Sequence, residues 1–239
     1  MINFKVQGVD YRCVHDWDDI QLWKAIELSN VCKECPEVLK NIYQGDTREL
    51  TPEDEIKTIP LFAGKVMKCL TDVPQDVIDR IMPEDRMEFF QTYLNKFVIG
   101  VMYQPLDYEP TMLKSFELEG ETYYIPQDRN ILGNLRPMPN ETAITFAESA
   151  DLRIFAKKME KSEIEVMPNV ISIICRLKDE PYDEQTSLDR AHKFERLPMP
   201  IVWEVFFYLN ECQRTLNSIM ETFSKVLESK VKKQQLTAV

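Results

Sequence analysis

The chain has 239 residues, of which 44% are hydrophobic and 29% charged, enough apolar material for one large core or two smaller ones. Its formal net charge of −11 at pH 7 gives a surface that repels nucleic-acid backbones and anionic membranes, so we expect neither as a direct partner. The sequence shows no signal peptide and no apolar stretch near the roughly 20 residues of a membrane span. We therefore expect a soluble cytosolic protein whose six cysteines are free thiols.

The first half of the chain is expected to begin with a β-hairpin. Apolar and polar residues alternate on both sides of Gln7-Gly8, where glycine supplies the positive φ of a tight turn. Helices are then expected at three places: after Asp18 or Asp19, either of which could cap the helix, after Pro60, and after Pro83.

A linker is expected at residues 105–115, which contain two prolines and lack helical periodicity. The second half then follows the same plan as the first. A hairpin is predicted around Glu119-Gly120, a helix capped by Asn140, a helix that starts at Pro168, and a last helix after Pro200.

Three short matches, in the same order in both halves, indicate an internal duplication. Each pairs a segment of the first half with one of the second: Phe4–Tyr11 with Phe116–Tyr123, Leu70–Asp76 with Leu177–Asp183, and Met82-Pro83 with Leu197-Pro198. The predicted fold class is therefore α+β and mostly α. It consists of two tandem diverged repeats, 1–104 and 116–239, each a β-hairpin followed by several helices.

The last helix is expected to run from Ile201 toward Lys230, which makes it long for its repeat. Its apolar residues recur in steps of three and four, a heptad-like stripe. We expect the first half of the stripe to pack on the protein's own core. Beyond Ser218 the stripe is predicted to bind a partner or a second copy of the chain through Leu216, Ile219, Phe223 and Val226.

One group of residues raises the question of a metal site. Cys32 and Cys35 form a C-x-x-C word, and Cys13 and His15 share one face of a strand upstream. Together they are the four ligands of a structural zinc ion, but their spacing is not that of a common zinc ribbon. The alternative is that these are unrelated cysteines, and we predict no metal and no cofactor.

Other candidates for catalysis have simpler explanations. Glu55-Ile56-Lys57 resembles the acid-x-lysine word of metal nucleases, yet Thr51 with Asp54 and Glu55 is typical of a helix N-terminus. The acidic group Asp16, Asp18 and Asp19 could bind a cation or supply an acid and a base, but it also suits a helix cap. No nucleophile triad or glycine-rich phosphate loop is present, so we predict that the protein is not an enzyme.

The chain resembles small acidic proteins encoded among the structural and assembly genes of tailed bacteriophages, especially tail-assembly chaperones. The segments that carry the resemblance are spread over most of the chain and are individually of low specificity: Asp16-Trp17-Asp18-Asp19-Ile20, Leu70–Phe90, Asn169–Cys175, Tyr182-Asp183, Leu197-Pro198 and Val205–Leu209. The internal duplication is a departure from the small chaperones of this kind, and it leaves a virion component open.

The resemblance implies a non-catalytic, protein-binding role in bacteriophage tail or virion assembly, as an assembly chaperone or a structural component. Its expected partners are phage structural proteins of the tail or capsid, and its expected location is the host cytoplasm or the virion. Two alternatives from other classes remain open. One is an acidic inhibitor that mimics nucleic acid and blocks a host enzyme; the other is a small metal-dependent enzyme.

Overall fold

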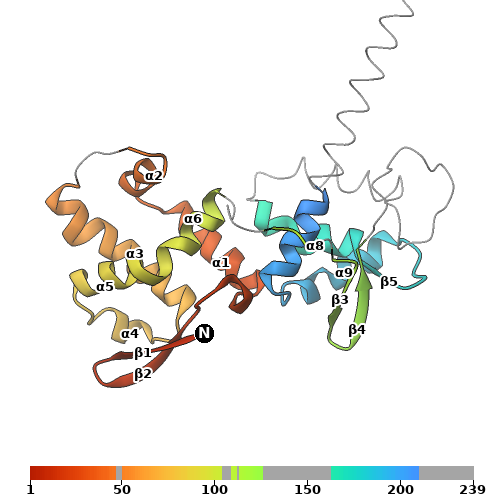
Figure 1. The fold of residues 1–239 in the computed structure, drawn as a ribbon, viewed down its shortest axis with the longest axis horizontal. Helices are drawn as coiled ribbons and strands as arrows, with labels where there is room; N and C mark the ends of the chain where they lie inside the picture. Colours follow the sequence, from red (N-terminus) through yellow and green to blue (C-terminus); the bar gives the residue numbers. More distant parts are fainter. Residues whose placement is uncertain (47–49, 104–108, 112, 126–162, 210–239) are drawn as a thin grey trace, which may run out of the picture. The chain divides into compact units, whose positions relative to one another are not determined.

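The computed structural model describes residues 1–46, 50–103, 109–111, 113–125 and 163–209 (Figure 1). These residues are mostly helical, with two small antiparallel sheets, which confirms an α+β, mostly α class. No helix in these ranges is both long enough and apolar enough to cross a bilayer. The predicted helix at Asn140 and the C-terminal helix beyond residue 209 lie outside the described residues.

The fold separates into two compact units. Unit 1 contains Met1–Glu109, Lys158–Pro168 and Ala191–Pro200, and unit 2 contains Pro110–Lys157, Asn169–Arg190 and Ile201–Val239. The chain therefore passes between the units more than once. The boundaries at 104 and 116 that the sequence suggests stay a prediction.

Unit 1 opens with the predicted hairpin, β1 (Ile2–Val6) and β2 (Val9–Cys13), paired with Phe4 opposite Tyr11. Gln7 and Gly8 have φ values of 52° and 84°, the two positive angles of a type I′ turn, whose twist matches that of the strands. A short piece of extended chain covers the outer edge of β2. There Cys13 bridges Thr71, and the Val14 N–H donates to the Leu70 carbonyl at 3.0 Å.

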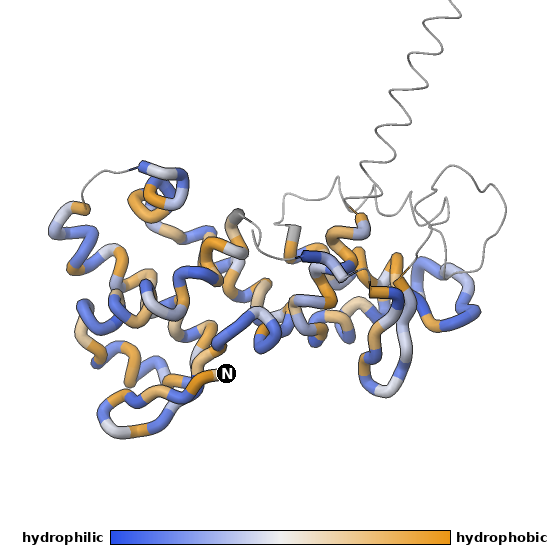
Figure 2. The backbone as a smooth tube through the Cα atoms, in the orientation of Figure 1, coloured by the Kyte–Doolittle hydropathy of each residue, from blue (hydrophilic) through white to orange (hydrophobic). Residues whose placement is uncertain are grey.

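The helices of unit 1 pack around a central, mainly apolar helix, α3 (Ile59–Leu70), in which nine of twelve residues are buried. Pro60 lies in the first turn of α3 and Pro83 is the first residue of α5, which confirms the two helix starts that the prolines predict. In Figure 2, hydrophobic and hydrophilic stretches alternate along the helices, as expected for helices with one buried face. The elements around α3 are, in chain order, η1 (Trp17–Asp19), α1 (Leu22–Lys33), α2 (Glu37–Tyr43), η2 (Asp54–Thr58), α4 (Gln75–Ile78), α5 (Pro83–Phe89), η3 (Phe90–Leu94) and α6 (Asn95–Tyr103).

The start of α1 differs from the prediction. Asp16 and Asp19 form a capping box around the 3₁₀ turn η1, and α1 begins only at Leu22, without a side-chain cap. Backbone carbonyls from far along the chain take over that function. The N–H groups of Leu22 and Trp23 donate to the carbonyls of Leu197 and Glu195, both at 2.8 Å. The first-turn amides of α1 are thus satisfied by a segment that no local sequence rule connects to it.

Unit 2 contains a second hairpin, β3 (Ser115–Leu118) and β4 (Glu121–Tyr124), with Phe116 opposite Tyr123. Its turn residues Glu119 and Gly120 have φ values of 53° and 83°, nearly those of the first hairpin. A third strand, β5 (Arg176–Leu177), pairs with the outer edge of β4. In each unit, therefore, the second strand of the hairpin is covered by chain that follows a buried helix.

The helix before β5 begins earlier than the sequence predicts. This helix, α8 (Glu163–Ile174), does not begin at Pro168 but carries it in its interior. The expected apolar residues Val170, Ile171, Ile173 and Ile174 are all buried. After β5 come α9 (Glu184–Phe194) and a helix over residues 199–209.

The second of the three sequence matches does not join equivalent residues. Leu70 is the last residue of α3, whereas Leu177 lies in β5. The residue that ends the corresponding buried helix is Ile174, three positions earlier. The hairpin match, in contrast, pairs residues at identical places in two hairpins of the same register.

Candidate binding site

The four zinc candidates do not form a metal site. Among the described residues no group of three histidine, cysteine or acidic side chains is placed to hold a metal ion. The Cys13 thiol donates to the carbonyl of Val14 at 3.1 Å, and His15 is exposed to solvent. The residues present therefore do not fit the structural zinc ion that the C-x-x-C word suggested.

The buried thiols are also poor nucleophiles. Burial raises the pKa of Cys32 to about 12 and the pKa values of Cys13, Cys35 and Cys69 to about 11. A thiol must lose its proton to bind a metal or attack a substrate, and these raised pKa values favour the protonated form near neutral pH. Cys69 and Cys175 are both buried in the core.

The acidic candidates serve as caps. Asp16 and Asp19 close the turn η1, and the Asp19 carboxylate also accepts from the N–H of His15 at 3.1 Å. Thr51 and Asp54 bond reciprocally, with the Thr51 hydroxyl donating to the Asp54 carboxylate at 2.6 Å. Glu55 and Lys57 then lie in the helical segment η2, so the capping interpretation is confirmed for this segment.

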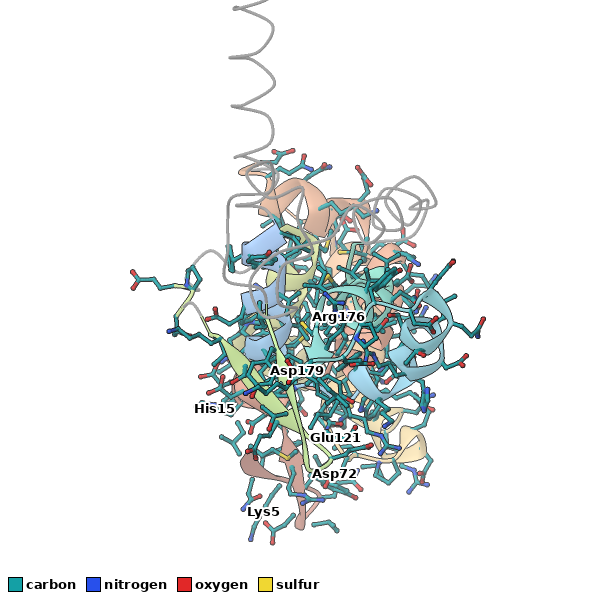
Figure 3. All side chains as sticks on the ribbon, turned by 90° about the vertical axis from the view of Figure 1, so that its right-hand side faces the viewer. Lys5, His15, Asp72, Glu121, Arg176 and Asp179 are labelled. Carbon is teal, nitrogen blue, oxygen red and sulfur yellow. The ribbon has the colours of Figure 1, made fainter. Side chains whose placement is uncertain are left out.

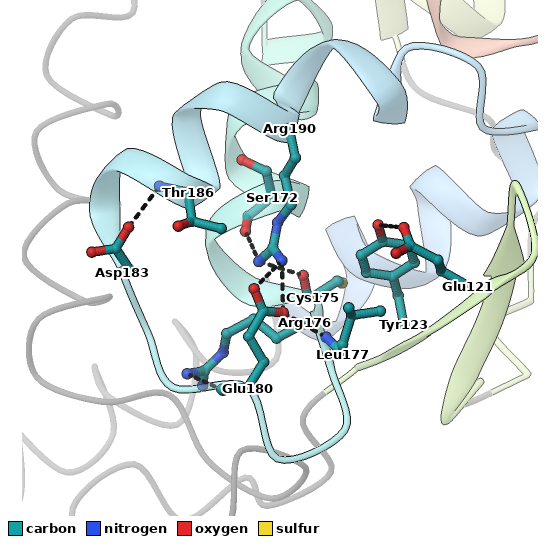
Figure 4. Close-up of polar contacts among 10 residues, drawn as sticks. All are labelled: Glu121, Tyr123, Ser172, Cys175, Arg176, Leu177, Glu180, Asp183, Thr186 and Arg190. Atoms are coloured by element: carbon teal, nitrogen blue, oxygen red, sulfur yellow. Dashed lines mark hydrogen bonds and ion pairs between the residues drawn. The ribbon is translucent and has the colours of Figure 1, made fainter.

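An ion pair lies in the interior of unit 2 (Figure 4). The Arg190 side chain, on α9, is 9% exposed and donates to both carboxylate oxygens of Glu180 at 2.7 Å. The same guanidinium donates to the carbonyls of Ser172 and Cys175 at 2.9 and 3.2 Å. Arg190 therefore joins the C-terminus of α8, where orphan carbonyls accumulate, to the loop that follows β5.

The Arg190 side chain also contacts the second hairpin. The Arg190 guanidinium lies 5.8 Å from the ring centre of Tyr123, which stacks on Phe116. The Tyr123 hydroxyl donates to Glu121 at 2.8 Å, and burial, followed by this bond, raises the pKa of Tyr123 above its usual value. The Arg190 guanidinium thus has a carboxylate, two carbonyls and an aromatic ring beside it, which is typical of a structural network.

The C-terminal residues predicted to bind a partner, Leu216, Ile219, Phe223 and Val226, lie outside the described residues. Their role as an interface stays a prediction. A different surface is described in full in unit 1, and the sequence did not single it out.

This surface is a groove of about 330 Å³ beside the first hairpin. One wall is the β1 side of the hairpin, and the other is the α4–α5 connection with α5; Met67 of α3 also lines it. Phe4 reaches across to Phe89, with ring centres 4.6 Å apart. We call this surface the β1 groove; its lining residues are Phe4, Lys5, Val6, Gln7, Met67, Arg80, Ile81, Met82, Asp85 and Phe89.

The β1 groove has an apolar floor and charged rims. The apolar residues come from the strand, α3 and α5, and Met82 is 60% exposed. The Lys5 side chain, near the hairpin tip, is 67% exposed, and its nearest carboxylate is Asp10 at 3.8 Å (Figure 3). Arg80 pairs with Asp76 on its own side of the groove at 3.0 Å. The lining residues thus include two basic side chains and one acidic side chain, Asp85, on a chain that is acidic overall.

The groove runs along an unpaired strand edge. Because Val6 and Val9 flank a two-residue turn, the pairs Val6–Val9 and Phe4–Tyr11 exchange the hydrogen bonds of the hairpin. The backbone groups of the alternate residues, Asn3 and Lys5, therefore point outward. No described residue pairs with this outer edge of β1.

No protein-family model, no curated protein and no solved structure matches this chain.

Proposed function

We propose that this protein works by binding another protein, without catalysis, during the assembly of a bacteriophage tail or virion. The observation that carries the binding role is the β1 groove, where an open apolar surface lies next to a strand edge that none of the described residues pairs with. Such edges associate with other polypeptides unless they are covered, and they are a common means of peptide recognition. The phage context rests on the sequence resemblance. As a chaperone the protein would act in the host cytoplasm, and as a structural component it would stay in the virion.

We further propose that the two units descend from one duplicated unit. The support is local: both hairpins have the same register, the same two positive φ angles in the turn, and a third segment on the edge of the second strand. Both units would then offer the first strand of a hairpin as an outer edge, with β1 lining a groove in unit 1.

Co-purification tests the assembly role. The tagged full chain, expressed in infected cells, is expected to bring down a phage tail or capsid protein in a fixed molar ratio. A control chain with Met82→Glu and Phe89→Ser in the groove should recover less of it. Recovery of the tagged chain alone at every stage of infection, and its absence from purified particles, would refute the proposal.

A further inference from the structure

We infer that the β1 groove binds an extended segment of the partner protein as an additional strand along β1. This inference rests on the proposed protein-binding function and specifies the chemistry of the partner. The segment carries two apolar side chains separated by one residue, and a carboxylate beyond them.

The backbone of β1 is what requires an extended partner. The outward N–H and C=O groups of Asn3 and Lys5 repeat at the two-residue spacing of a strand, about 6.7 Å. Only another extended backbone presents donors and acceptors at the same spacing. A strand added there would lie about 4.8 Å from β1, on the side where the groove is hollowed between β1 and Ile81-Met82.

The protein already uses this kind of contact on the other edge of the same hairpin. The Asp72 N–H donates to the Arg12 carbonyl at 3.1 Å, and the Arg12 N–H donates to the Asp72 carboxylate at 2.6 Å. That edge is therefore closed, and β1 is the edge that remains for a partner. In unit 2, β5 covers the matching edge of β4.

The groove selects the side chains of the partner. In an added strand alternate side chains point the same way, so two of them, one residue apart, would face the apolar floor formed by Val6, Ile81 and Phe89. Lys5 and Arg80 are exposed and pair with the exposed carboxylates of Asp10 and Asp76, at 3.8 and 3.0 Å, so a carboxylate at the end of the segment can replace or join either pair. Within this chain, too, carboxylates bind backbone amides: Glu204 accepts from the N–H groups of Thr111 and Leu113 at 2.6 and 3.1 Å.

The charge on β1 also disfavours pairing of this edge with the same edge of a second copy of the chain. A lysine on an exposed edge strand opposes the approach of a second basic or identical edge. Two copies of β1 would bring Lys5 near its equivalent in the other copy, and the net charge of −11 on each chain adds to the repulsion. A partner strand with a carboxylate near Lys5 avoids this repulsion.

A synthetic peptide tests the inference directly. The probe is the seven-residue peptide acetyl-Glu-Thr-Val-Thr-Val-Thr-Glu-amide, titrated into the full ¹⁵N-labelled chain. Saturating peptide is expected to slow hydrogen exchange at the Asn3 and Lys5 amides at least tenfold. An isomer with adjacent valines, acetyl-Glu-Thr-Val-Val-Thr-Thr-Glu-amide, should bind at least fivefold more weakly, because its apolar side chains point to opposite faces.

Variants at the edge separate strand addition from other modes of binding. Lys5→Pro removes an N–H that the hairpin does not use, and should weaken peptide binding at least tenfold. Lys5→Thr keeps the N–H and loses only the charge, so it should stay within about threefold of the wild type. If Lys5→Pro fails to fold, Met82→Glu places a carboxylate in the exposed part of the groove lining at the start of α5, where acids are tolerated, and should weaken binding equally.

Wild-type binding by both Lys5→Pro and Met82→Glu, or equal binding of the two peptides, would overturn the inference. Failure of strand addition is distinguishable from failure of the proposed function. A phage protein that co-purifies equally well with Lys5→Pro would leave the function intact and refute the edge. Peptide binding without recovery of any phage partner would support strand addition at β1 and refute the proposed role in phage assembly.

Discussion

The absence of a side chain at position 100 decides how Trp17 packs against α6. The Trp17 ring lies edge-on to Phe97, with ring centres 5.1 Å apart, and covers Gly100 so closely that a Cβ would overlap the ring. We expect Gly100→Ala to lower the free energy of unfolding by about 1–2 kcal/mol, because overpacking outweighs the gain in helix propensity. Urea denaturation measures the change.

Gly64, in α3, is the matched control. A Cβ there would meet Arg86 and Ile78 at 3.4 and 3.5 Å, which are ordinary contacts. Gly64→Ala should therefore be neutral or stabilising by up to about 1 kcal/mol. Equal destabilisation by both substitutions would contradict this explanation of Gly100.

The buried thiols allow a second prediction at the scale of single residues. With pKa values raised by burial, Cys13, Cys32, Cys35 and Cys69 should not react with Ellman's reagent within minutes at pH 8 in the folded protein. The Cys212→Ser variant retains only the five described cysteines, all buried, and should show no fast thiol. In urea all five should react. A rapid thiol in the folded variant would show that burial does not protect them.

At the scale of elements, Arg190 holds α8, β5 and α9 together. Arg190→Leu should cost about 2–3 kcal/mol in chemical denaturation, because it leaves the largely buried Glu180 carboxylate with only the Leu177 N–H and takes the donor from two carbonyls at the C-terminus of α8. In a double-mutant cycle with Glu180→Leu, we expect a coupling energy of about 1–3 kcal/mol.

The exposed pair Arg80–Asp76 provides the comparison for this cycle. Both side chains are about two-thirds exposed and lie one turn apart on a helix surface. Their coupling energy should stay below about 0.5 kcal/mol. Similar coupling in the two cycles would show that burial does not strengthen the Arg190–Glu180 pair.

The segment that covers β2 gives a prediction about pH. The Arg12 N–H and then the Arg12 guanidinium hold the pKa of Asp72 below its ordinary value of 3.8. Because the folded pKa is depressed, the stabilisation is complete above the ordinary value and is lost as pH falls through the folded one. The stability difference between wild type and Asp72→Asn should therefore shrink below about pH 4 in denaturation curves.

Arg12→Gln separates the two causes. It removes the guanidinium but keeps the backbone N–H, the larger cause, so most of the pH dependence should remain. A pH-independent difference between wild type and Asp72→Asn would contradict the assignment.

Both hairpins could be predicted because their signals are local. Alternating apolar residues and a glycine at Gly8 and Gly120 are enough to specify strands and a type I′ turn, and Pro60 and Pro83 mark helix starts. The start of α8 could not be predicted in this way, because Pro168 suggests a beginning where the packing of a buried helix tolerates an interior proline.

The β1 groove escaped prediction for a different reason. Its strand was predicted, but the other wall depends on where the α4–α5 connection lies after the chain has folded. A free edge is also a property of the assembled sheet and not of the strand's own residues. Likewise, no local pattern determines where Cys13 and His15 lie relative to Cys32 and Cys35, and in the structure the four do not form one cluster.

At the scale of the whole molecule, the salt dependence of binding distinguishes the proposed function from a nucleic-acid mimic, which would bind through the net charge of −11. Contacts through backbone hydrogen bonds and an apolar groove depend little on salt, whereas a mimic that binds a basic enzyme by many ion pairs depends on it strongly. We expect affinity for the co-purified partner to change less than fivefold between 50 and 500 mM NaCl. A loss of a hundredfold, measured by calorimetry, would favour the inhibitor.

The carbonyls of Glu195 and Leu197 that close the first turn of α1 have a consequence for biosynthesis. About 170 residues are translated between Trp23 and Glu195, so the ribosome must make most of the polypeptide before α1 receives its last hydrogen bonds. Unit 1 therefore cannot complete its fold when only its first hundred residues have left the ribosome. A nascent chain stalled near residue 104 would present an incomplete core to cellular proteases, and the finished protein would not.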